Sequence, residues 1–155
     1  MICWLLDTNV AQEIIKPNGN RRVQSWSKAQ AGPTVYISVL SLAEFDKGIA
    51  NLPDEDLRRA IVATQRDNLA ADFARRILPV SDEVARRWGT ISGRIKRDTG
   101  HPAPVIDTLP AATAIEHDLY LVTRNVRDVR LSGAAVFNPW DDDPASVVLP
   151  ARRRR

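Results

Sequence analysis

Short apolar segments that alternate with helical segments constrain the fold of this chain most strongly. Residues 2–6 form a continuous apolar run, as buried parallel strands do. Further short runs of this kind cover residues 35–38, 119–122 and 134–137. Strands that are separated by helices pair in parallel through right-handed crossovers. The sequence therefore predicts an α/β fold with a four- to five-stranded parallel sheet flanked by helices on both faces.

In the segments between these runs, apolar residues recur at helical spacing. The predicted helices cover residues 8–15, 21–30, 38–51, 54–76, 82–97 and 107–117. The segment 78–80 is predicted to be a short extended link. The two helices on either side of that link are expected to form an arm that stands partly off the sheet.

The length of 155 residues suits one domain with a full hydrophobic core. We predict a domain over residues 1–140 and a C-terminal tail over residues 141–155 that is flexible at its arginine-rich end. Subtracting the four arginines at 152–155 from the net charge of +3 leaves −1. The basic balance therefore belongs to the tail, and a nucleic-acid ligand has to be inferred from local chemistry.

The apolar runs and the cysteine content indicate the cellular compartment. The longest runs hold about five residues, whereas about 20 are needed to cross a bilayer. The first run lacks a preceding basic region and ends early at Asp7, unlike a signal peptide. Cys3 is the single cysteine, so no internal disulfide can form. A cytoplasmic protein without a membrane partner is expected.

Three carboxylates lie at junctions between apolar segments and helices. Asp7 closes the first apolar run, Glu44 follows the second, and Asp107 comes after Pro104-Val105-Ile106. In open α/β sheets, ligands bind outside the carboxyl ends of the strands. Carboxylates that meet there repel each other unless a cation lies between them. Oxygen ligands suit Mg²⁺ or Mn²⁺, so the pattern predicts a divalent-metal site made by these three acids.

Each acid also has a simpler explanation when it is taken alone. Asp7 and Asp107 are good helix caps, and Glu44 could complete a capping box with Ser41. The helix of Glu44 is expected to begin earlier, at Ser38 or the next residue, which places the carboxylate on its inward side. An inward carboxylate needs a partner, and either a metal ion or an arginine would serve.

The polar segment after the apolar run 119–122 adds further candidates. Asn125 offers a neutral oxygen to a metal ion or a hydrogen bond to one of its waters. The candidate RNA contacts are Arg86, Arg87, Arg94 and Arg124, and a solvated helix face explains the first three equally well. Zinc does not fit, because the two histidines lack ligand spacing and the lone cysteine lies in a strand.

Taken together, these pieces resemble PIN domains, in particular the VapC toxins of bacterial toxin–antitoxin pairs and the similar FitB proteins. The segments that carry the resemblance come in the family's order and span residues 1 to about 140. They are Leu6-Asp7-Thr8-Asn9-Val10, residues 37–49 around Glu44, residues 105–114 around Asp107, residues 121–128 around Asn125, and Val136-Phe137-Asn138-Pro139-Trp140.

The resemblance implies an RNA endonuclease that depends on Mg²⁺ or Mn²⁺ and is inhibited by a VapB-like antitoxin protein. It also implies a homodimer that reaches operator DNA only through the antitoxin. Asp7, Glu44 and Asp107 fall on the family's acidic positions, and Asn125 falls on a fourth position that is often acidic. Asp128 lies three residues farther on, and the sequence does not favour a role for it. Pro110 stands where the family usually has Ile or Leu.

Other functions remain to be separated from this one. A PIN-like domain could bind metal without catalysis and act as a nucleic-acid-binding or regulatory module. A haloacid-dehalogenase-like phosphatase requires Asp-x-Asp after the first strand, whereas Asp7 is followed by Thr8 and Asn9. A receiver domain requires a late lysine, and no lysine follows Lys96.

Overall fold

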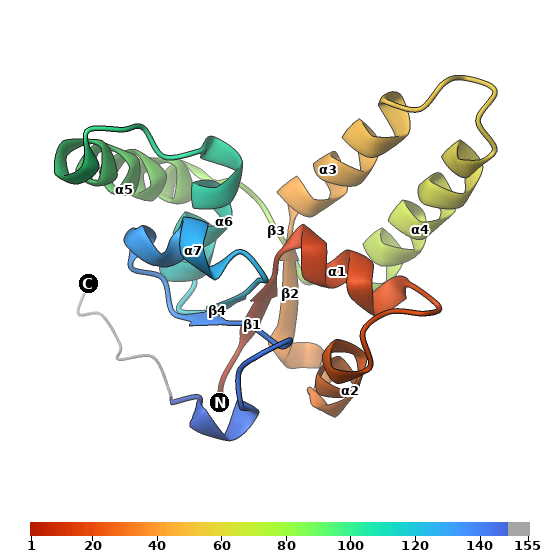
Figure 1. Ribbon diagram of the computed structural model, residues 1–155, viewed down its shortest axis with the longest axis horizontal. Coiled ribbons are helices and arrows are strands. Elements are labelled where there is room, and N and C mark those ends of the chain that lie inside the picture. The colour runs from red at the N-terminus through yellow and green to blue at the C-terminus, as the bar shows by residue number, and fades with distance from the viewer. Residues whose placement is uncertain (149–155) are drawn as a thin grey trace.

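A parallel sheet of five strands in the order β3-β2-β1-β4-β5 forms the centre of the molecule (Figure 1). The structure is a computed structural model that describes residues 1–148. The strands are β1 Trp4–Leu6, β2 Val35–Ser38, β3 Ile77–Leu78, β4 Tyr120–Val122 and β5 Val136–Phe137. The chain runs from β1 outward to β3 and then returns to the other side of β1. The switch in strand order therefore lies between β1 and β4, where α/β sheets bind their ligands.

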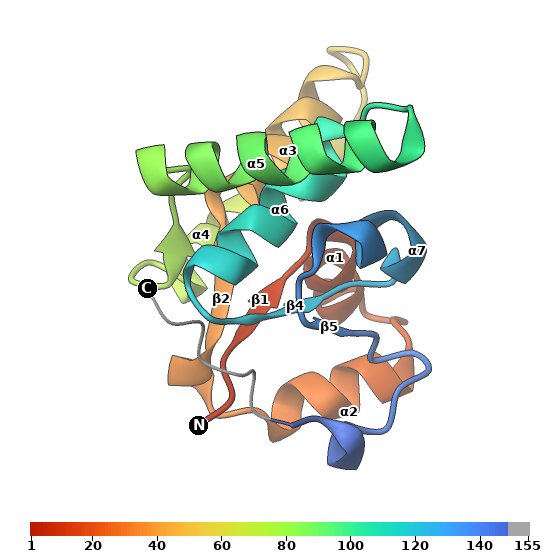
Figure 2. The ribbon, with the colours of Figure 1, turned by 90° about the vertical axis from the view of Figure 1, so that its left-hand side faces the viewer.

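Helices cover both faces of the sheet. They are α1 Thr8–Ile15, α2 Arg21–Ala29, α3 Val39–Ala50, α4 Arg58–Asp72, α5 Asp82–Thr99, α6 Val105–Glu116 and α7 Val126–Val129. Helices α1 and α2 lie on one face, and α6 and α7 on the other (Figure 1). Helix α5 lies across α6, as the turned view shows (Figure 2). Within residues 1–148, no helix combines the length and the apolar character that crossing a membrane requires.

Side-chain alternation along β1 explains why both faces are covered. Trp4 and Leu6 pack with Val10 of α1, whereas Leu5 packs with Ala111 of α6. Successive side chains of a strand point to opposite faces, so an apolar strand creates two faces that must be buried. The continuous apolar run at 2–6 thus determines a three-layer arrangement. The predicted α/β fold with a four- to five-stranded parallel sheet is confirmed, and the sheet has five strands.

An aromatic cluster fills the space between the sheet and α2. The ring of Trp4 lies 5.2 Å from that of Trp26, nearly perpendicular to it. Tyr120 and Phe137 lie 5.5 and 5.4 Å from the same ring of Trp4. Edge and tilted contacts at these distances are favourable for aromatic rings. The cluster joins β1, β4 and β5 to α2 and stabilises the sheet below its ligand-binding edge.

The predicted link at residues 78–80 is wrong in part, because its start belongs to the sheet. Ile77 and Leu78 form the edge strand β3, which pairs with Ile37 and Ser38 of β2. The backbone N–H of Ile37 also donates to the carbonyl of Arg76 at 3.0 Å. The outer edge of β2 carries backbone groups that need partners, and a short strand supplies them.

The predicted helical arm is also wrong. Helix α4 begins at Arg58, not at residue 54, and it packs along α3, while α5 packs on α6. The reason is the apolar stripe of α5. Val84, Ile91 and Ile95 are buried against Ala112 and Ile115 of α6. The apolar stripe of α5 is covered by α6 in this way, whereas an isolated arm would leave that stripe in water.

The first part of the predicted tail is held against the domain. Arg22 donates from Nη2 to the backbone carbonyls of Asp141 and Asp142, at 3.2 and 2.7 Å. Asn138 donates from its backbone N–H to Oδ2 of Asp142 at 2.7 Å. Val147 packs against the core. The expected flexibility of the arginine-rich end falls on residues outside the described part of the chain, and the domain boundary at 140 stays a prediction.

Phe137→Ala tests the aromatic cluster. Phe137 is 1% exposed, so its truncation leaves a cavity and is expected to lower the free energy of unfolding by about 3–5 kcal/mol. Leu57→Ala is the matched control, because Leu57 is 86% exposed and its loss should change that free energy by no more than about 0.5 kcal/mol. Urea unfolding of both variants measures the difference, and equal midpoints would contradict the assignment.

Candidate active site

The four side chains predicted as the site line one pocket of about 360 Å³. Asp7 and Asn125 follow β1 and β4, Glu44 comes from α3, and Asp107 comes from α6. We call this space the acidic pocket. It is also lined by Thr8, Asn9, Gln12, Lys47, Gly48, Asn51 and Ile106. Segments that are more than a hundred residues apart in the sequence thus meet at the switch point of the sheet, as the parallel topology predicts.

Asp7 acts as the N-cap of α1 and faces the acidic pocket at the same time. Its Oδ1 accepts a hydrogen bond from the backbone N–H of Thr8 at 2.8 Å. Its Oδ2 accepts from Nδ2 of Asn9 at 2.7 Å and from Oγ1 of Thr123 at 2.6 Å. Capping and site chemistry are therefore compatible explanations of Asp7. The three donors hold the carboxylate in one orientation.

Glu44 lies inside α3 and has a hydrogen-bond partner from α1. Ser38 is the N-cap of α3 and accepts from the backbone N–H of Leu40 at 3.2 Å. The expected start at Ser38 is confirmed, and the capping box with Ser41 does not form. Thr8, which is buried, donates from Oγ1 to Oε2 of Glu44. The partner that an inward carboxylate needs is therefore a threonine in this structure.

Asp107 lies in the first turn of α6 and does not follow a strand. Residues 105–106 form the start of that helix and Pro104 is its N-cap, so the predicted helix start at residue 107 and the reading of Asp107 as a cap are both wrong. Burial raises the pKa of the Asp107 carboxyl above its usual range, and the negative charges of Asp128 and Asp7 raise it further. The charge of Asp128 has a larger effect than that of Asp7, although the sequence did not favour a role for Asp128.

The turn after β4 positions Asn125 and Arg124. The backbone N–H of Asn125 donates to Oγ1 of Thr123 at 3.0 Å, and the backbone N–H of Arg124 donates to Oδ1 of Asn9 at 3.2 Å. The guanidinium of Arg124 lies 5.3 Å from the ring centre of Trp140. Thr123 thus bonds both Asp7 and the turn, which fixes the distance between β1 and β4 at the pocket.

The predicted RNA contacts on α5 make bonds within the protein. Arg86 pairs with Asp82 at 2.7 Å, and Arg87 pairs with Glu116 at 2.7 Å. Arg94 donates from Nη2 to the backbone carbonyls of Leu131 and Ser132, at 3.0 and 2.8 Å. Their contact with RNA stays a prediction.

The basic side chain that does line the acidic pocket is Lys47, which sequence analysis missed. Lys47 lies three residues after Glu44 on α3, and residues at this spacing share one side of a helix. That spacing is the signal that could have identified it. An ammonium group beside three carboxylates offers a contact for a phosphate that enters the pocket.

The acidic pocket suits a hydrated divalent ion better than a fully protein-ligated one. Among residues 1–148, no three Asp, Glu, His or Cys side chains lie close enough together to hold one ion directly. Mg²⁺ usually retains several waters and takes one or two carboxylates. A cation would also offset the repulsion that raises the pKa of Asp107. The roles of Asp7, Glu44 and Asp107 as ligands of that ion stay a prediction.

Comparison with known protein families matches residues 4–133 to the PIN domain. The chain is 34% identical over 138 residues to Toxin FitB of Neisseria gonorrhoeae, which covers 89% of this chain and 99% of that protein. It is 29% identical over 137 residues to VapC ribonuclease Y4jK of Sinorhizobium fredii, with 88% and 97% coverage. A chain in the structure of FitAB bound to IR36 DNA fragment superposes with a TM-score of 0.79 and 32% identity, covering 90% of this chain and 97% of that one.

Asp107→Asn tests the repulsion in the pocket. A carboxyl whose pKa is raised in the folded state makes the protein less stable as the pH rises, because the folded state disfavours the charged form of that carboxyl. At pH 7 and without metal, the variant should therefore melt about 1–3 °C higher than the wild type. The difference should close as the pH falls well below about 3.9, the ordinary pKa of an aspartate, because Asp107 is then protonated in both the folded and the unfolded state.

The same pair of proteins tests the metal site. Mn²⁺ should raise the melting temperature of the wild type through binding to the folded state, and should raise that of Asp107→Asn much less. Differential scanning fluorimetry with and without EDTA measures both effects. An equal response to Mn²⁺ in the two proteins would contradict the assignment of Asp107 as a ligand.

Proposed function

The chain belongs to the PIN-domain family, and from that premise we propose that it is an RNA endonuclease dependent on Mg²⁺ or Mn²⁺ that acts as the toxin of a toxin–antitoxin pair. The resemblance found in the sequence is confirmed by the family match. The observation that carries the proposal is the convergence of Asp7, Glu44, Asp107 and Asn125 on one polar pocket. The names of the relatives support it, since one is called a toxin and another a ribonuclease.

The side chains of the acidic pocket divide the work of phosphodiester hydrolysis. Asp7 and Asp107 would hold the metal ion, and Asn125 would offer it a neutral oxygen. When bound, the ion would lower the pKa of a water and offset the charge of the scissile phosphate. Glu44, to which Thr8 donates a hydrogen bond, would accept a hydrogen bond from the water that attacks the phosphate. Lys47 contacts the phosphate that enters the pocket.

Asp7→Asn tests the nuclease. The amide keeps the size of the side chain but removes the charge that holds the cation, so cleavage of RNA should fall by at least about 100-fold. EDTA should abolish cleavage by the wild type, and Mg²⁺ or Mn²⁺ should restore it. The measurement is gel analysis of a labelled single-stranded RNA, with melting curves to verify the fold.

Asp98→Asn is the matched control, because Asp98 lies on α5, is exposed and pairs with Arg97. It should cleave like the wild type. Cleavage retained by Asp7→Asn would contradict the proposed chemistry. Metal binding without any cleavage of RNA would favour the alternative, a PIN-like domain with a non-catalytic role.

The proposed partner is a small VapB-like antitoxin protein that binds operator DNA. The structure of FitAB bound to a DNA fragment supports this, as it contains a chain similar to the present one. An apolar pocket of about 230 Å³ between α1, α2 and α4 gives a partner side chain a place to bind. In this proposal the toxin is a homodimer in the cytoplasm, and it reaches DNA only through the antitoxin.

Co-expression with the protein encoded in the neighbouring reading frame tests the partner. The two chains should co-purify as an assembly that contains two copies of the toxin, as light scattering measures. RNA cleavage should be suppressed in the assembly, and only the assembly should shift promoter DNA in a gel. Binding of that DNA by the toxin alone would contradict the proposed division of roles.

A further inference from the structure

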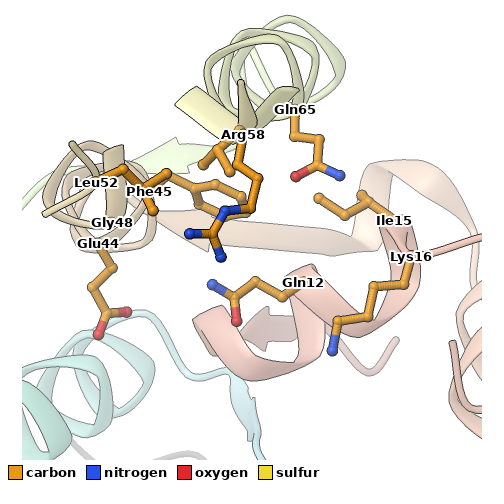
Figure 3. A pocket seen from close by; sticks show the side chains of 10 residues that line it. Gln12, Ile15, Lys16, Glu44, Phe45, Gly48, Leu52, Arg58 and Gln65 are labelled. Atoms are coloured by element: carbon orange, nitrogen blue, oxygen red, sulfur yellow. The ribbon is translucent and has the colours of Figure 1, made fainter. Parts of the chain in front are cut away.

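A second pocket of about 390 Å³ opens beside the acidic pocket, between α1, α3 and α4 (Figure 3). We call it the α4 pocket. Gln12, Glu44 and Gly48 line both pockets, so the two spaces adjoin. An RNA strand whose phosphate lies in the acidic pocket therefore has a neighbouring space into which its next nucleotide can extend.

Gly48 keeps the passage between the two pockets open. It lies in the last turn of α3, a helix in which alanine is more favourable than glycine. A Cβ atom built at this position would meet no atom within 4 Å. Local packing therefore does not require a glycine here. The missing side chain leaves space on the side of α3 that faces both pockets.

The lining of the α4 pocket combines an apolar floor with polar groups at its sides. Ile15, Phe45, Leu52 and Val62 supply the apolar part. The amides of Gln12 and Gln65 supply polar groups that both donate and accept hydrogen bonds. A flat heterocycle with donors and acceptors on its edges matches this combination.

Arg58 provides a preorganised cation at the α4 pocket. Its side chain reaches from the start of α4 into the space above Gln12 (Figure 3). Asp56 holds the guanidinium through Nε at 3.0 Å and Nη2 at 2.6 Å. Hydrogen bonds from Arg58 lower the pKa of Asp56 to about 2, so this pair stays charged at neutral pH. A planar guanidinium can stack on a base or bind a phosphate.

The wall that carries Arg58 is fixed by a second arginine. Arg59 donates from Nη1 to the backbone carbonyls of Ile49 and Leu52, at 2.9 and 2.6 Å. These bonds tie the start of α4 to the end of α3. The pocket is therefore formed before a ligand arrives, which reduces the entropic cost of binding.

We propose that the α4 pocket is a nucleoside subsite that receives the base next to the scissile phosphate. This inference rests on the proposed nuclease function and adds a determinant of sequence preference to it. The acids repel the RNA backbone, so binding energy has to come from neighbouring contacts. Arg58 and Lys16 supply positive charge, the apolar floor accepts the face of the base, and Gln65 contacts its edge.

The decisive variants are Arg58→Gln and Gln65→Leu, because both residues line the α4 pocket and lie outside the acidic pocket. Each is assayed on single-stranded RNA with randomised bases around the cleavage site, and the products are sequenced. The KM should rise about tenfold, which is the order of loss for one base contact, while kcat stays within about twofold. The base preference on one side of the cleaved bond should weaken.

Gly48→Leu tests the passage itself. The added side chain should fill the junction between the pockets and raise KM, while the melting temperature should not fall, because leucine favours a helix. Gly89→Leu is the matched control, since Gly89 is an exposed glycine of α5 with open space around it. Arg75→Gln, at an exposed arginine after α4, is the charge control. Both controls should behave like the wild type.

The outcomes separate the two proposals. If the wild type cleaves RNA but Arg58→Gln and Gln65→Leu keep its KM and base preference, the subsite is wrong and the nuclease stands. If these variants weaken only the antitoxin complex, the α4 pocket is a protein-docking groove and the subsite is likewise wrong. If the wild type cleaves no RNA with either metal, the nuclease proposal fails, and the subsite fails with it.

Discussion

The hydrogen bonds around the carboxylate of Asp7 hold the functional edge of this protein together. One side chain accepts from the first residue of α1, from Asn9 and from Thr123 after β4. The backbone N–H of Asp7 also donates to the carbonyl of Val122 at 2.9 Å. These bonds join the two central strands to a helix at the switch point of the sheet. A side chain that caps a helix thereby becomes a rigid wall of a pocket.

Electrostatic repulsion among the carboxylates of that pocket destabilises the fold, and packing in other parts of the protein offsets it. Asp107 lies partly buried near the charges of Asp128 and Asp7, and its carboxyl pKa rises accordingly. Its place in the first turn of α6, where a carboxylate is favourable, offsets part of this repulsion. The aromatic cluster below the sheet edge and the apolar contacts of α5 with α6 stabilise the frame that tolerates it. Unfavourable charge placement of this kind is typical of functional sites.

Local sequence signals predicted the parts of the fold that depend on local chemistry. The run at 2–6 identified β1, and Ser38 proved to be the N-cap of α3. Asp7 was recognised both as a cap and as a site residue. The errors fall where partners distant in sequence decide the outcome. Whether residues 77–78 form a strand depends on the free edge of β2, and the position of α4 depends on α3.

The amino-acid sequence by itself determined the α/β class, the order of the motifs and the identity of four of the side chains that line the acidic pocket. Residue type and spacing encode these features, because helical and strand periodicities are local. Only the tertiary structure decided that Asp128 acts on Asp107, that Thr8 holds Glu44, and that Lys47 and Arg58 stand at the two pockets. Side chains from different elements meet there because of how the helices pack, and no local pattern specifies those distances.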